Sequence, residues 1–249
     1  MAKSICIQSG HWNVQSGATG APMEQVRTLA IGLKLVDLLR KQGYIVYHTD
    51  GYADKNPDVT GKDWDLFLSL HCDANYAGDE GGGFVDYPDP SIDSSNKESK
   101  RIKEAIESVY FKETGIRNVP SRRNNNTKFY YIWSALSAKT PCVILEMGES
   151  IDPHDSVILN DTERVAKAIL GGINKAFPGV VTPEIPSDPC ADVKRTLALT
   201  EQDNTTKQAM IDDLKSNLSA SNSKLKPLQE RNAKLEAYVQ SIKELTLKI

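Results

Sequence analysis

The stretch 65-DLFLSLHCDA-74 decides the fold of this 249-residue chain. Residues 66–70 are apolar apart from Ser69, which is typical of a strand that is buried on both faces. Such strands belong to parallel sheets covered by helices. Because His71 follows this run directly, the stretch also predicts a polar group at the end of a buried strand.

Strand-like and helix-like segments alternate around this stretch as far as residue 178. We expect further strands at residues 4–8, 45–49, 84–87 and 142–145. Three helices are expected: one opening at Pro22 and ending at Gly43, one over residues 97–114, and one from a capping-box-like start at Asn160 and Glu163 to Phe177. This alternation predicts an α/β fold with a mixed, mostly parallel sheet flanked by helices.

Prolines at positions 178, 183, 186 and 189 mark an extended linker. We therefore divide the chain into an α/β domain at residues 1–179, a linker at 180–190, and a helical region at 191–249. The polar, asparagine-rich segment 121–128 is expected to be a loop within the first domain.

The C-terminal region carries apolar residues in alternating three- and four-residue steps, the pattern of a coiled-coil seam. The seam comprises Ile211, Leu214, Leu218, Ser221, Leu225, Leu228, Asn232, Leu235, Val239, Ile242, Thr246 and Ile249. This favours a homo-oligomer formed through residues 191–249, or a helical element that binds another surface. Pro227 is expected to break the helix, so a helical hairpin and a partly disordered tail stay open.

Composition excludes several other classes. The net charge is -3, and Lys and Arg are spread along the chain, which argues against a nucleic-acid partner. No run approaches the roughly 18 apolar residues of a membrane span. The N-terminus lacks the apolar core of a secretory signal, so we expect synthesis in a cytoplasm without a signal peptide. The four cysteines are widely spaced, and we interpret them as reduced thiols.

Four polar residues are positioned to share one site at the carboxyl edge of the sheet. His11 and His71 follow the strands at 4–8 and 66–70, Glu146 follows the strand at 142–145, and Glu24 opens the helix after the His11 loop. Two imidazoles and a carboxylate form a known hydrolytic zinc set with a fourth position for water. A further carboxylate would accept the proton of that water.

These motifs resemble those of the zinc-dependent N-acetylmuramoyl-L-alanine amidases of bacterial autolysins and bacteriophage endolysins. The resemblance rests on Gly10-His11, Glu24 at the head of an amphipathic helix, residues 65–74, and Val143 to Gly148. It implies that His11, Glu24 and His71 bind zinc and that Glu146 is catalytic. It also implies hydrolysis of the amide between N-acetylmuramic acid and the L-alanine of the stem peptide in peptidoglycan.

The sequence departs from the family pattern at two positions. Asp73 stands where the family usually has an asparagine, and Glu149 where it usually has an aromatic residue. Arg122 and Arg123 lie where the family often has a basic loop, and we expect them either to contact stem-peptide carboxylates or to face solvent. The aromatic group at 129–133 is interpreted as a strand that packs into the core, with sugar stacking as the alternative. His48 and His154 lie in none of these motifs, and we interpret each as either a surface histidine or one satisfied by structural partners.

The resemblance favours a bacteriophage endolysin made in the host cytoplasm and acting on the cell wall. Residues 191–249 would then either form an oligomer or target the enzyme to that wall. A cytoplasmic enzyme that recycles wall fragments is an alternative. A zinc peptidase that cuts within the stem peptide could use the same metal ligands. A wall-binding protein without activity is a third alternative, against which the four intact positions argue.

Overall fold

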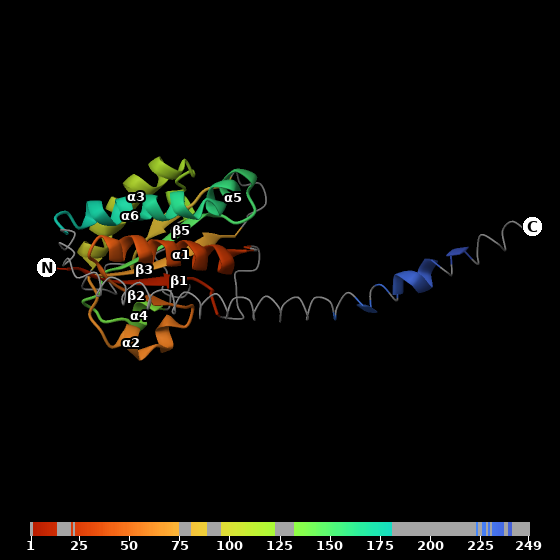
Figure 1. Cartoon of the computed structure of the whole chain (residues 1–249), viewed down its shortest axis with the longest axis horizontal. Coiled ribbons are helices and arrows are strands. Elements are labelled where there is room, and N and C mark those ends of the chain that lie inside the picture. The colour runs from red at the N-terminus through yellow and green to blue at the C-terminus, as the bar shows by residue number, and fades with distance from the viewer. Residues whose placement is uncertain are drawn as a thin grey trace, which may run out of the picture. The chain divides into compact units, whose positions relative to one another are not determined.

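The computed structural model describes residues 2–13, 21, 23–74, 81–88, 96–122 and 132–180, with scattered residues between 223 and 240. It divides into two compact units, residues 1–184 and 185–249. The first unit is the α/β domain (Figure 1). No helix among the described residues is long and apolar enough to cross a membrane.

A five-stranded sheet with the order β2-β1-β3-β5-β4 forms the centre of this unit. The strands are β1 (Ser4–Ser9), β2 (Ile45–Thr49), β3 (Leu66–Asp73), β4 (Phe84–Asp86) and β5 (Cys142–Glu149). Neighbouring strands pair in parallel except β4, which runs antiparallel to β5. The prediction of a mixed, mostly parallel sheet is confirmed.

Helices cover the sheet on both faces, as Figure 1 shows. The helices α1 (Glu24–Lys41), α3 (Asn96–Thr114) and α6 (Thr162–Ala176) cover one face, and α2 (Pro57–Thr60) and α4 (Ile132–Ala135) cover the other. Successive side chains of β3 point alternately to the two faces of the sheet. Leu66, Leu68 and Leu70 join the larger apolar cluster under the long helices, whereas Phe67 joins the smaller cluster with Trp133.

Two strands extend further than expected. His71 and Glu146 lie inside β3 and β5 rather than after them, and they are partners in the ladder. The ladder between β3 and β5 continues through both residues, and on the other side of β5 the first residue of β4, Phe84, pairs with Glu146. The register of the two strands therefore fixes His71 and Glu146 side by side.

The segment after β5 differs from the expectation of one helix starting at Asn160. It contains α5 (Pro153–Asn160) before α6, and Asn160 ends α5. The Asp161 carboxylate caps α6 by accepting from the Arg164 amide at 3.1 Å. The start of α5 has the Asp-Pro signal of a helix N-terminus, with Asp152 as its cap.

The aromatic group at 129–133 was expected to form a strand, and its described C-terminal part is helical instead. Trp133 lies in the short helix α4, so its assignment to a strand is wrong, but it is buried in the smaller apolar cluster, as predicted. Residues 129–131 lie outside the described part of the chain.

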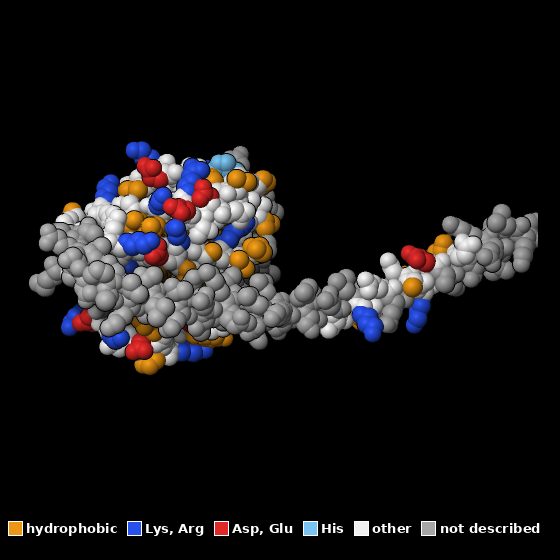
Figure 2. Space-filling model, in the orientation of Figure 1, with side chains coloured by type: hydrophobic (Ala, Val, Ile, Leu, Met, Phe, Trp, Pro, Cys, Tyr) orange, Lys and Arg blue, Asp and Glu red, His pale blue; other side chains and the backbone are white. Residues whose placement is uncertain are grey.

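The charged side chains on the face shown in Figure 2 are of both signs and lie interspersed, in keeping with the small net charge. In the second unit, the described residues between 223 and 240 are helical, and Pro227 is among them. The side chains of Leu235 and Val239 are about half exposed. Most of the proposed seam lies outside the described residues.

Close packing of α3 on α6 generates a prediction at Gly172. A Cβ there would lie 2.6 Å from the Ile106 Cα, so Gly172→Ala is expected to lower the free energy of unfolding by about 1–3 kcal/mol. Denaturant unfolding measures this. Gly171→Ala is the matched control, because its Cβ would meet only a methyl group of Val109, at 3.1 Å. Equal stability of the two variants would contradict the prediction.

Candidate metal centre

His11 is held in a tight turn directly after β1. The Gly10 amide donates to the Leu70 carbonyl at 2.8 Å, which ties the turn to β3. His11 itself has φ 56°, in the left-handed region that side chains other than glycine seldom adopt. This conformation turns the chain back at the edge of the sheet, beside the end of β3.

His71 packs its imidazole ring against the backbone of Gly10. A Cβ at position 10 would lie 2.5 Å from two atoms of that ring. The two histidine rings meet edge to face, with centroids 4.9 Å apart. Only a glycine at position 10 allows this approach, which explains the Gly-His sequence at the end of β1.

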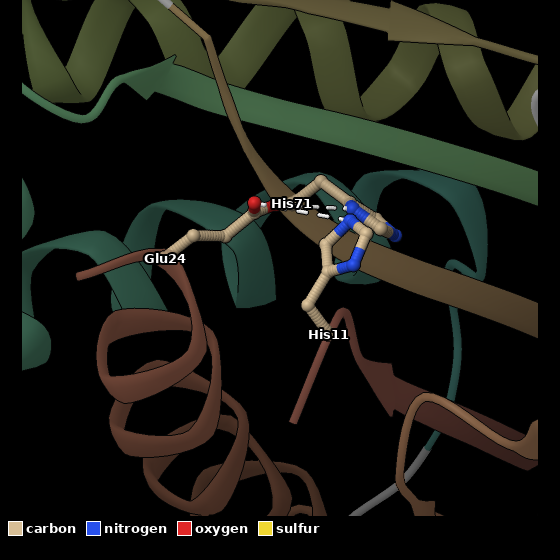
Figure 3. A group of neighbouring side chains, drawn as sticks. All are labelled: His11, Glu24 and His71. Atoms are coloured by element: carbon tan, nitrogen blue, oxygen red, sulfur yellow. Dashed lines mark hydrogen bonds and ion pairs between the residues drawn. The ribbon is translucent and has the colours of Figure 1, made fainter. Parts of the chain in front are cut away.

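Glu24 is the first residue of α1 and points from the helix toward both imidazoles (Figure 3). Its Oε1 lies 3.1 Å from Nδ1 of His71 and accepts the Cys72 amide at 3.0 Å. Its Oε2 lies 3.8 Å from Nε2 of His11. Each of the three residues offers a ligand atom within 4.8 Å of the other two. The structure therefore brings together the three residues that the sequence predicts as ligands.

The chemistry of this group fits a divalent zinc ion. The Glu24 side chain is 2% exposed, and Oε2 has no hydrogen-bond partner among the described residues. A buried carboxylate is costly unless its charge is compensated, and a cation between the three side chains would compensate it. Two imidazole nitrogens and a carboxylate oxygen are ligands that zinc accepts.

The start of α1 is fixed to the end of β1 by a short hydrogen-bond network. Thr28 Oγ1 donates to the Gly10 carbonyl at 2.8 Å, and Ser9 Oγ donates to the Thr28 carbonyl at 2.9 Å. His48 Nε2 lies 2.9 Å from the same Ser9 oxygen and, since the single hydroxyl proton is used, must be the donor. The network positions the helix turn that carries Glu24.

His48 thus has a structural partner, as the sequence interpretation expected. Burial, together with the Arg40 charge, lowers the pKa of His48 to about 4. The neutral ring stacks on Trp12, with planes 3° apart and centroids 5.5 Å apart. The residue after His11 is therefore packed in place.

Glu146 lies in β5 as the ladder partner of His71. Partners in a parallel ladder direct their side chains to the same face of the sheet, so the Glu146 carboxylate lies on the same side as the His71 imidazole. It is 8% exposed. This placement suits a carboxylate that serves a reaction beside the three candidate metal ligands.

Arg122, predicted as a contact for substrate, directs its guanidinium to residues of its own chain. Nη1 donates to Asp73 Oδ2 at 3.1 Å, and Nη2 lies 2.6 Å from Glu149 Oε1. The two positions that depart from the family pattern thus share one arginine. Burial raises the pKa of the Asp73 carboxyl, although Arg122 opposes that shift. Arg123 lies outside the described residues.

Sequence reasoning missed Asp155, a buried residue of α5. Its Oδ2 accepts the Gly82 amide at 2.6 Å and the Glu149 amide at 3.0 Å. It therefore joins the turn before β4 to the end of β5. The Asp-Pro signal at 152–153 could have located the helix that carries it. Its neighbour His154 has a side chain that is 66% exposed, in keeping with the interpretation of that residue.

Residues 5–175 match the model of a family described as N-acetylmuramoyl-L-alanine amidase, which is more than half of the chain. The chain belongs to the N-acetylmuramoyl-L-alanine amidase family. It is accordingly a peptidoglycan hydrolase with that amidase activity. The family match favours this activity over a stem-peptide peptidase or a wall-binding protein without activity.

Solved structures share the fold of this amidase. AmiC2 of Nostoc punctiforme has a TM-score of 0.55 and 21% identity, over 70% of this chain and 96% of that one. Ami1 of Mycobacterium abscessus has a TM-score of 0.56 and 15% identity, over 71% and 99%. The catalytic domain of the CD27L endolysin, which targets Clostridia difficile, has a TM-score of 0.50 and 23% identity, over 69% and 96%. A comparison with curated proteins finds no match.

The packing of His71 on Gly10 predicts the effect of one methyl group on this amidase. Gly10→Ala is expected to reduce the zinc content of the purified protein, because the new Cβ would collide with the His71 ring and the Leu70 carbonyl. Metal analysis after dialysis measures the loss, and circular dichroism checks the fold. Gly171→Ala, on α6, is the control. Full zinc occupancy in Gly10→Ala would refute the account of this contact.

Proposed function

We propose that this amidase is a zinc enzyme in which His11, Glu24 and His71 hold the metal and Glu146 is the catalytic acid and base. Two observations carry the proposal together. The three residues offer ligand atoms that lie within 4.8 Å of one another, and the buried Glu146 is the ladder partner of one of them, His71. The substrate is the amide between the lactyl group of N-acetylmuramic acid and L-alanine of the stem peptide.

The metal site and Glu146 have different tasks in the proposed reaction. Zinc at this site would polarise the scissile carbonyl and lower the pKa of the attacking water toward about 7. Glu146 takes one proton from that water as its oxygen forms a bond to the carbonyl carbon. When the carbon–nitrogen bond breaks, Glu146 gives the proton to the leaving amine of L-alanine. The hydrogen bond that the Cys72 amide donates to Oε1 helps to hold the Glu24 carboxylate in place.

Mass spectrometry of fragments released from defined peptidoglycan tests the reaction. Released stem peptides should carry a free amine on L-alanine, and a chelator should stop the release. Glu146→Gln should keep the zinc and lose activity by at least about a hundredfold. His71→Ala should lose the zinc as well, because two protein ligands bind it much more weakly. Shortened stems, or near-normal activity of Glu146→Gln, would contradict the assignment.

We further propose that the enzyme is a bacteriophage endolysin. The CD27L endolysin, whose catalytic domain shares this fold, supports the idea. An endolysin must act on polymeric wall, whereas an enzyme that recycles wall fragments acts on small soluble muropeptides. Comparable or faster cleavage of intact sacculi than of soluble muropeptides is the result expected of an endolysin.

Residues 191–249 are proposed to raise activity on whole walls, through oligomerisation or wall binding. Oligomerisation would place several catalytic units on one insoluble substrate and raise their effective concentration. A chain ended after Glu184 keeps Val180, which packs against the core. It should match the full chain on soluble muropeptide but be slower on intact cells. Light scattering separates oligomerisation from wall binding, and equal activity on both substrates would rule out both roles.

A further inference from the structure

The register between β3 and β5 shifts immediately after the site. From His71 to Asp73 strand β3 advances two residues, whereas from Glu146 to Glu149 strand β5 advances three. The extra residue makes a β-bulge in β5, directly after Glu146. A bulge bends its strand and changes the direction of the side chains beside it, so its conformation affects where Glu146 points.

Arg122 joins the two strands just beyond this bulge. Asp73 and Glu149 are ladder partners there, and the two terminal nitrogens of one guanidinium reach one carboxylate each. The carbonyl oxygens of Gly81 and Gly82 lie at 3.5 Å and 3.4 Å from the same group. The side chains of Asp73, Glu149 and Arg122 are 10%, 0% and 13% exposed.

We propose that Arg122 is a positioning residue, which fixes the bulge and thereby the direction of Glu146 relative to His71. The inference rests on the proposed role of Glu146 as acid and base. Arg122 acts here through Asp73 and Glu149 and not by contact with substrate. The planar fork of arginine suits this task, because one nitrogen serves each strand, whereas the single ammonium of lysine cannot span both in the same geometry.

Other contacts hold the bulge only in part. Tyr110 donates to the Met147 carbonyl at 2.8 Å, and Asp155 accepts the Glu149 amide. Neither of these two contacts links β5 to β3, which beyond the bulge are joined by the Ser150 amide, donating to the Asp73 carbonyl at 3.3 Å. Arg122 adds a link between the side chains of the two strands, because its guanidinium contacts Asp73 of β3 and Glu149 of β5.

The metal ligand His71 is restrained separately. Its ring packs on Gly10, and its Nδ1 lies 3.1 Å from Glu24. A change at Arg122 should therefore disturb Glu146 and leave the metal ligands in place. The effect on kcat, the substrate KM and the zinc content can thus be told apart.

Arg122→Lys in the full chain is the first test. It should lower kcat by about ten- to a hundredfold, since a displacement of about 1 Å can cost that much, while KM stays within about twofold. Zinc content and the absorption spectrum of the cobalt-substituted protein should stay as in the wild type. Arg101→Lys, a change to another arginine that pairs with a carboxylate, should leave all of these unchanged.

The combination with Glu146→Gln tests whether Arg122 acts through Glu146. In that background Arg122→Lys should reduce the remaining activity by less than about twofold, because residues that act as a unit are not additive. A raised KM with normal kcat, an unchanged kcat, or fully additive losses would each overturn the positioning role. If Arg122→Lys does not fold, Glu149→Gln keeps the side-chain volume, cuts the same link, and should lower kcat without loss of zinc. The single Glu146→Gln variant tests the proposed function by itself.

Discussion

The Glu24 carboxylate connects the three segments on which the site depends. It begins α1, lies against the imidazole of His71 on β3, and faces His11 in the turn after β1. A buried carboxylate is stable only where hydrogen bonds or a cation compensate it, and the Cys72 amide supplies part of that compensation. Hydrogen bonds among Ser9, Thr28 and Gly10 hold the first turns of α1 against the edge of the sheet. The helix start, the strand ends and the proposed zinc site therefore form one unit.

The same edge of the sheet concentrates negative charge. Glu24, Asp73, Glu146 and Glu149 are all buried there. Two arginines approach the end of β5 from different elements. Arg27 of α1 donates to the carbonyl of Ser150, and Arg122 pairs with Glu149. Both contacts restrain the strand that carries Glu146. Only the Arg122–Glu149 contact is a buried ion pair, in which removal of one partner is costly.

Much of this arrangement follows from the sequence, for identifiable reasons. The apolar run 66–70 predicts a parallel sheet, and polar residues after such runs converge because parallel strands end at one edge. That reasoning brings His11, Glu24 and His71 together correctly. It does not predict that β3 and β5 continue to Asp73 and Glu149, because pairing between strands far apart in the sequence, and not the local apolar run, decides where the ladder ends.

The partners of Arg122 illustrate what sequence cannot supply. Asp73 lies 49 residues before it, and a one-residue bulge decides that Glu149 is the residue opposite Asp73. No local pattern encodes such a pairing. The short helix α4 is a different case, because aromatic residues favour strands locally and tertiary packing overrides that preference. The helix α5 was predictable, since Asp152 and Pro153 carry its N-terminal signal.

The reversed direction of β4 explains how the guanidinium of Arg122 can be so fully engaged. Because β4 is antiparallel to β5, it brings its first residues, and not its last, to the edge where β3 and β5 end. The glycines before it allow the backbone to come close, since a Cβ at Gly83 would lie 2.1 Å from the Glu146 carbonyl oxygen. A guanidinium has five N–H groups, more than two single carboxylate contacts can accept. The carbonyls of Gly81 and Gly82, delivered by the reversed strand, provide further acceptors and make the edge strand part of the support for the site.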